Sequence, residues 1–109
     1  MSDVLGTFEQ AVLLAVRRLG EDAYGRAILK EVQARLQRNI VAGAIYATLD
    51  RLERKALLSS RLGLGTAARD GRARRYYSLE DAGLRALNES RAAAEKLWLG
   101  FKWPLEGGA

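Results

Sequence analysis

The side chains of this sequence that could act chemically are mostly basic, and they are concentrated in one segment. Residues 51–75 hold eight Lys and Arg residues against two acids, whereas the whole chain of 109 residues has a net charge of +5. A positive surface of this kind attracts polyanions, most often nucleic acid. The bases are Arg51, Arg54, Lys55, Arg61, Arg69, Arg72, Arg74 and Arg75. The sequence therefore predicts that function resides in this segment.

Catalysis by the common routes is disfavoured, because the chain contains neither His nor Cys. A Ser-His-Asp or Cys-His arrangement is therefore impossible, and the usual zinc ligands are missing. The adjacent acids Glu21-Asp22 and Glu80-Asp81 suit the starts of helices better than a catalytic pair. We expect no enzyme, no metal and no cofactor. Since no apolar run approaches the ~20 residues of a membrane span, we expect a cytoplasmic protein.

Three helices are predicted in the first half of the chain, because apolar residues recur there every three or four positions. The first helix spans residues 5–19 and ends at Gly20, the second runs from Ala23 to about Gln37, and the third from about Val41 to Lys55. The third helix turns Ile45, Leu49 and Leu52 inward. These helices must position the first bases of the basic segment.

The pattern changes to alternation after Lys55, which predicts a β-hairpin. One strand covers residues 57–62, a basic loop rich in glycine covers residues 63–71, and a second strand covers residues 73–79 with Tyr77 facing the core. Helix, helix, helix, hairpin is the order of a winged helix-turn-helix. The fold class is therefore mainly α with a small hairpin, and the basic loop is the predicted wing.

A long last helix is predicted from about Ser78–Asp81 to Lys102, stopped by Trp103-Pro104. Its apolar positions alternate between spacings of three and four residues, as in a coiled-coil seam. The helix is also too long for the rest of this small domain to bury its apolar side. The sequence predicts a homodimer with these contacts: Leu5, Phe8, Val12, Leu84, Leu87, Arg91, Ala94, Trp98 and Phe101. Trp98 is either dimer core or a platform for a small aromatic or drug-like ligand. The predicted division is residues 1–79 for DNA binding, 80–103 for dimerisation and 104–109 as a flexible tail.

The third helix and the wing carry the candidate DNA contacts. Thr48 is expected at base edges and Tyr46 and Arg51 at phosphates, while wing arginines enter a minor groove or bind phosphates. In the opposing interpretation Tyr46 covers the edge of the core, Thr48 is merely solvated and the basic run is an ordinary charged surface. The predicted contacts are Ala44, Tyr46, Ala47, Thr48, Arg51, Arg69, Arg72 and Arg74.

Three stretches together resemble the PadR family of bacterial transcriptional regulators: FEQAVLLAVRRLGEDAYGRAI, GAIYATLDRLERKALLSS and GRARRYYSLEDAGLRAL. The resemblance covers roughly residues 5–90. It implies a winged helix-turn-helix dimer of the short subfamily, which has a single C-terminal dimerisation helix and mostly represses transcription. Some members bind aromatic or drug-like ligands between the paired last helices.

The resemblance extends to individual residues. The family's AYG pattern matches Ala23, Tyr24 and Gly25, its YxxLxRLE pattern matches Tyr46, Leu49, Arg51, Leu52 and Glu53, and its GRxRRYY pattern matches Gly71, Arg72, Arg74, Arg75, Tyr76 and Tyr77. Two positions depart from it. Ala56 stands where the family usually has Gly, which would cost ~1 kcal/mol in a left-handed conformation. Glu80 replaces the usual Thr cap, so Ser78, with Asp81 three residues on, is the expected cap of the last helix.

The expected function is sequence-specific regulation of transcription, with a homodimer bound to a pseudo-palindromic DNA operator. The alternative is a sequence-blind architectural protein that binds DNA or RNA through the same charge.

Overall fold

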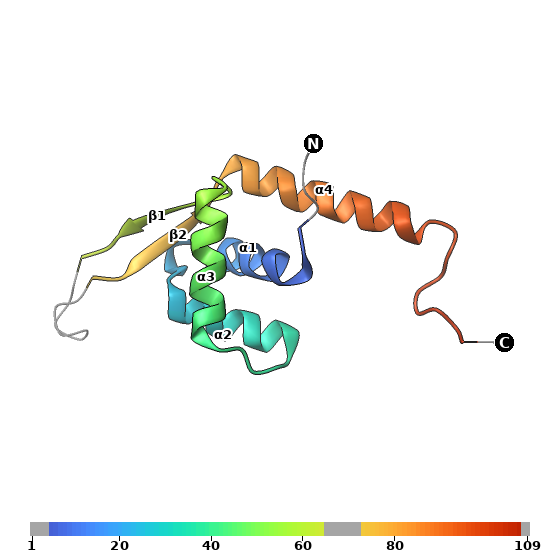
Figure 1. Ribbon diagram of the computed structural model, residues 1–109, viewed down its shortest axis with the longest axis horizontal. Helices are drawn as coiled ribbons and strands as arrows, with labels where there is room; N and C mark the ends of the chain where they lie inside the picture. Colours follow the sequence, from blue (N-terminus) through green and yellow to red (C-terminus); the bar gives the residue numbers. More distant parts are fainter. Residues whose placement is uncertain (1–4, 65–72, 108–109) are drawn as a thin grey trace.

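The computed structural model describes residues 5–64 and 73–107. Its elements are α1 (Thr7–Leu19), the short 3₁₀ helix η1 (Gly20–Asp22), α2 (Gly25–Leu36), α3 (Ala42–Arg54), β1 (Leu58–Leu62), β2 (Arg75–Leu79) and α4 (Asp81–Trp98). Three helices form the body, the hairpin projects from one side and α4 runs out on the other (Figure 1). This order confirms the predicted winged helix-turn-helix with a long C-terminal helix.

The core lies between α1, α2 and α3 and is closed by the start of the hairpin. Each element contributes the apolar positions that its periodicity placed on one face. The largest fully buried side chains are Val12, Leu13, Ile28, Val32, Ile45, Leu49, Leu52 and Leu58. α3 is therefore held on its inner side by three aliphatic side chains, which leaves its opposite side free.

The hairpin is attached to the turn between α1 and α2 by backbone pairing. β1 and β2 are antiparallel, with Leu58 opposite Leu79 and Leu62 opposite Arg75. On its other edge β2 receives an isolated bridge from Tyr24 to Tyr76, and the Tyr77 N–H donates to the Ala23 carbonyl at 2.8 Å. Tyr77 is buried, as the alternation predicted. The strand that enters the wing is thus fixed against the residues that start α2.

α3 ends in a left-handed residue that is not glycine. Ala56 has φ +61°, its N–H donates to the Glu53 carbonyl at 2.9 Å, and the Leu57 N–H donates to the Leu52 carbonyl at 3.0 Å. This is the geometry in which glycine is preferred after a helix. Ala56, which stands where the family pattern has Gly, is therefore in a strained backbone conformation.

Two expectations about α4 are wrong. The helix ends at Trp98 instead of Lys102, because Leu99 leaves the helical conformation with ψ 128° and Gly100 adopts φ +91°; Phe101 consequently lies outside the helix. At the other end Glu80 is the N-cap residue, without a side-chain cap. Ser78 cannot cap the helix because it still pairs with Ser59 in the hairpin.

The predicted dimer contacts of α1 also need correction. Leu5 and Val12 are buried in the core of their own chain, and Phe8 is half-buried against it. The Leu5 N–H donates to the hydroxyl of Ser90 in α4 at 3.0 Å, and both residues are buried. The segment before α1 therefore holds α4 to the body of the same chain, while contact of Phe8 with a second chain stays a prediction. None of the described helices is long and apolar enough to cross a membrane.

Candidate nucleic-acid interface

α3 presents one buried side and one exposed side, and the predicted contact residues divide between them. Ala47, Tyr46 and Arg51 are exposed and Ala44 is half-buried. Thr48 is only 3 % exposed, and its Oγ1 accepts a hydrogen bond from Arg51 Nη2 at 3.3 Å. The expectation that Thr48 contacts base edges therefore does not fit this structure. Its hydroxyl lies on the inner side of α3, where it orients Arg51.

Tyr46 lies against the start of α2. A Cβ atom at Gly25 would collide with the Tyr46 ring, so the ring takes the space that a glycine leaves open. Tyr46 remains 47 % exposed. Its phenol is thus held at the junction of α2 and α3 while its outer face stays accessible.

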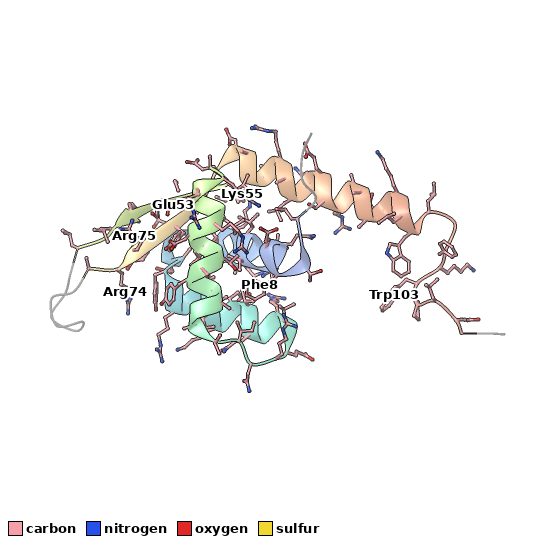
Figure 2. All side chains as sticks on the ribbon, viewed as in Figure 1. Phe8, Glu53, Lys55, Arg74, Arg75 and Trp103 are labelled. Atoms are coloured by element: carbon pink, nitrogen blue, oxygen red, sulfur yellow. The ribbon has the colours of Figure 1, made fainter. Side chains whose placement is uncertain are left out.

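Two arginines of the hairpin stack on tyrosines beside this junction. The Arg74 guanidinium lies 4.0 Å from the centroid of the Tyr24 ring, and that of Arg61 lies 5.0 Å from the centroid of Tyr76. The two rings meet edge to face, with centroids 5.8 Å apart. Cation–π contacts of this kind fix the direction of a guanidinium without neutralising its charge. Figure 2 shows Arg74 and Arg75 on the hairpin side of the molecule.

A cavity of about 280 Å³ opens where α2, α3 and β2 meet. Its lining combines guanidinium groups, phenols and the first residues of α2, a set that suits the oxygen atoms of a phosphate. The lining residues are Tyr24, Gly25, Arg26, Tyr46, Ala73, Arg74, Arg75 and Tyr77. The fold therefore brings Tyr46 and Arg74, two of the predicted DNA contacts, to one place.

The bases at the other edge of α3 are paired within the chain. Glu9 of α1 lies 3.7 Å from Arg51 Nε and 3.5 Å from Lys55 Nζ, and its other oxygen accepts the Gly6 N–H at 3.2 Å. Since the Arg51 and Lys55 side chains are exposed and the Glu9 carboxylate is only half-buried, these pairs contribute little to stability. They hold two cations of α3 against α1 and lower the charge at that edge.

Arg75 belongs to a second network, which joins the hairpin to α3. Its Nη1 donates to Ser60 Oγ at 2.9 Å, and the Ser60 hydroxyl donates to Glu53 Oε2 at 2.7 Å. Burial, followed by the charge of Glu53, raises the pKa of Tyr77 above its ordinary value. The network locks the angle between α3 and β2. The predicted wing residues Arg69 and Arg72 lie outside the described residues.

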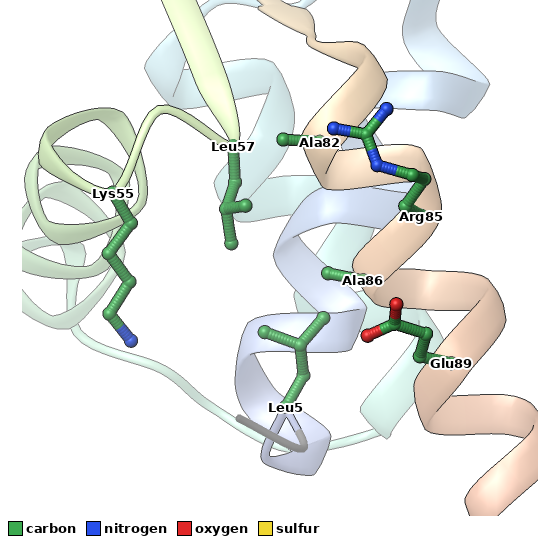
Figure 3. Close-up of a pocket in the computed structure, with 7 residues that line it drawn as sticks. All are labelled: Leu5, Lys55, Leu57, Ala82, Arg85, Ala86 and Glu89. Carbon is green, nitrogen blue, oxygen red and sulfur yellow. The ribbon is translucent and has the colours of Figure 1, made fainter. Parts of the chain in front are cut away.

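A second cavity, of about 410 Å³, lies where α4 leaves the body (Figure 3). Its lining is Leu5, Lys55, Leu57, Ala82, Arg85, Ala86 and Glu89. Trp98 is not among these residues, so the predicted ligand platform and this cavity are separate places.

The seam predicted on α4 is accessible along most of its length. Leu84, Arg91, Ala94 and Trp98 are exposed and Leu87 is half-buried against the core. Exposed apolar side chains continue beyond the helix at Leu99, Phe101, Trp103 and Leu105. Figure 2 shows Trp103 far from the body of the molecule.

Sequence reasoning missed Asp50 on the exposed side of α3. The signal was present, because Asp50 lies opposite Ile45, Leu49 and Leu52 at 3.6 residues per turn. It also missed Tyr24, whose stacking with Arg74 depends on strand pairing between segments far apart in the sequence.

Comparison with known proteins matches residues 12–89 to the transcriptional regulator PadR-like family. A PadR family transcriptional regulator from Eggerthella lenta DSM 2243 is 36 % identical over 79 % of this chain and 72 % of its own, with a TM-score of 0.63. A PadR-like transcription factor from Bacteroides fragilis is 29 % identical over 84 % of each chain, with a TM-score of 0.69.

A PadR-like transcriptional regulator from Bacillus cereus strain ATCC 14579 is similar in fold, with a TM-score of 0.68 at 24 % identity over 84 % of each chain. Among curated proteins, none matches the sequence significantly. The family match spans well over half of the chain and agrees with the observed order of elements. This protein belongs to the PadR-like family of transcriptional regulators and is a DNA-binding transcription regulator with a winged-helix fold.

Proposed function

We propose that this protein acts as a homodimeric repressor that binds a pseudo-palindromic operator. α3 enters the major groove, and the hairpin with its basic loop holds the adjacent backbone. The observation that carries the proposal is the position of Tyr46 and Arg74 at one cavity between α2, α3 and β2. A recognition helix and a wing strand that meet in this way offer a continuous positive surface to a duplex. Because the ligand is genomic DNA, we place the protein in the cytoplasm.

Dimerisation through α4 is supported by the apolar surface at its end. Trp98 is 42 % exposed and Leu97, one position before it, 79 %. The helix has 18 residues, about 27 Å at 1.5 Å per residue, and its second half extends away from the body (Figure 1). Large apolar side chains that are exposed together at one end of a helix are typical of an interaction site. A second copy would cover Leu84, Leu87, Ala94 and Trp98, with half-sites ~10 bp apart on the operator.

The experiment is a competition assay at fixed salt between an inverted repeat taken from the DNA upstream of the gene and random duplex of equal length. A sequence-specific regulator binds the operator at least about a thousandfold more tightly than random DNA. A ratio near one would instead favour a sequence-blind architectural protein, and RNA competitors would separate DNA from RNA binding. Sedimentation of Trp98→Ala tests the dimer, because loss of the ring should shift the protein towards monomer.

We also propose that a flat aromatic or drug-like effector binds between the two copies of Trp98 and releases the operator. Its support is the exposure of the indole at the end of the dimerisation seam, where two rings related by symmetry can enclose a planar ligand. The chain has two tryptophans, so fluorescence quenching by an aromatic cation is measured in a Trp103→Phe background. If Trp98→Ala dissociates the dimer while ligand affinity is unchanged, Trp98 is dimer core and not a ligand platform.

A further inference from the structure

Four residues form a stripe along the middle of the exposed side of α3, flanked by the exposed residues Tyr46 and Arg51. Ile45, Thr48, Leu49 and Leu52 are buried, and at 3.6 residues per turn the positions opposite them recur at intervals of four, three and four. Those positions are Gly43, Ala47, Asp50 and Arg54, all of them exposed. If α3 enters the major groove, as the proposed function requires, this stripe faces the base edges.

The first half of the stripe has no side chain that can form a hydrogen bond. A Cβ atom at Gly43 would meet nothing within 4 Å, and Ala47 offers only a methyl group, which suits the methyl group of thymine. Such small residues allow the helix backbone to approach the floor of the groove closely. Since Thr48 is buried, the first polar side chain on the stripe is Asp50.

Asp50 is unpaired, unlike the other acid of α3. Glu53 accepts a hydrogen bond from Ser60 at 2.7 Å, whereas Asp50 forms no hydrogen bond or ion pair with any residue of 5–64 or 73–107, not even with Arg54 one turn later. It lines a shallow cavity of about 300 Å³ with Glu53 and Arg54. A carboxylate that faces a polyanion weakens binding by charge repulsion unless it accepts a hydrogen bond from a donor group of that ligand.

We infer that Asp50 is a specificity-determining residue that accepts a hydrogen bond from the N4 amino group of one cytosine in each half-site. Cytosine presents a donor in the major groove without an adjacent acceptor. Adenine places the N7 acceptor beside its amino group, guanine presents two acceptors and thymine one, so a carboxylate disfavours all three. This inference rests on the proposed binding of α3 in the major groove.

The test is selection of binding sites from randomised duplex DNA, followed by competition with single-base variants of the selected site. The wild-type dimer should favour cytosine at one position per half-site by about tenfold. Asp50→Asn should favour adenine there, because an amide forms a bidentate contact with N6 and N7. Asp50→Ala should bind all four bases alike at that position and keep its preferences elsewhere. Both variants should also bind random DNA more tightly than wild type, since a negative charge is removed.

The matched control is Asp81→Asn, which removes the same charge from an exposed residue in the first turn of α4. It should leave every base preference unchanged. If Asp50→Ala retains the wild-type preference at every position, the assignment of Asp50 is overturned while sequence-specific binding stands. If the wild-type protein itself selects no sequence, operator recognition and the assignment of Asp50 both fail. Thermal unfolding by circular dichroism confirms that each variant is folded, as expected for exposed positions.

Discussion

Replacing Ala56 by glycine should stabilise this protein. Ala56 is exposed and left-handed, with φ +61°, a conformation that costs an L-residue about 1–2 kcal/mol. Glycine removes this strain but makes the unfolded chain more flexible, which costs about 0.4–1 kcal/mol. The hydrogen bonds from the N–H groups of residues 56 and 57 involve only backbone and are kept. Taken at the middle of both ranges, the balance is a gain of about 0.8 kcal/mol in the free energy of unfolding.

The assay is urea unfolding followed by circular dichroism, at one protein concentration because the proposed dimerisation would make stability depend on concentration. The midpoint for Ala56→Gly should rise while the m-value stays constant. The matched control is Ala34→Gly in the exposed side of α2, which should lose about 1 kcal/mol because its backbone is helical. DNA affinity should be unchanged, since Ala56 lies beyond the recognition helix. A midpoint for Ala56→Gly equal to or below that of wild type would refute the strain argument.

Three further changes test other parts of the structure. Arg74→Ala should weaken binding to all DNA sequences and reduce the salt slope by about one, if the stacked guanidinium contacts a phosphate; an unchanged slope would exclude that contact. Ser90→Ala leaves the buried Leu5 N–H without its acceptor and should cost about 1–3 kcal/mol of stability, whereas exposed Ser78→Ala should not. The pKa of Tyr77 is raised above 10.0, chiefly by burial, so its stabilising contribution is complete below pH 10 and is lost as pH rises through the raised value. The difference in absorbance at 295 nm between wild type and Tyr77→Phe should therefore appear only above pH 10, and an earlier change would contradict the burial of the phenol.

Periodicity alone was sufficient to predict most of the fold. The spacing of Ile45, Leu49 and Leu52 predicts α3 to within one residue at each end, because burying one side of a helix requires apolar residues every three or four positions. Alternation likewise predicts β2 and the inward position of Tyr77. The end of α4 was missed because its seam spacing continues past the helix to Phe101, while Gly100 turns the backbone away.

Local pattern is a weaker guide to the candidate site. Sequence reasoning placed Thr48 off the buried face of α3 because it took Ile45, Leu49 and Leu52 as the core positions, but Thr48 is buried with them and its hydroxyl accepts a hydrogen bond from Arg51. It assigned Leu5 and Val12 to a second chain, although the body of the same chain covers them. In each case the residue type is compatible with both a buried and an exposed position. Which of the two it occupies depends on where the neighbouring helices and strands lie.

The sequence by itself determined that this protein is a basic winged helix without the residues for common catalysis, because charge, composition and hydrophobic period are properties of the chain. The tertiary structure decided which bases remain available to DNA. Glu9 holds Arg51 and Lys55 and the Ser60–Glu53 pair holds Arg75, whereas Arg74 is only stacked on Tyr24. These pairings join residues distant in sequence, and they exist only once β2 is aligned with α2 and α1 with α3.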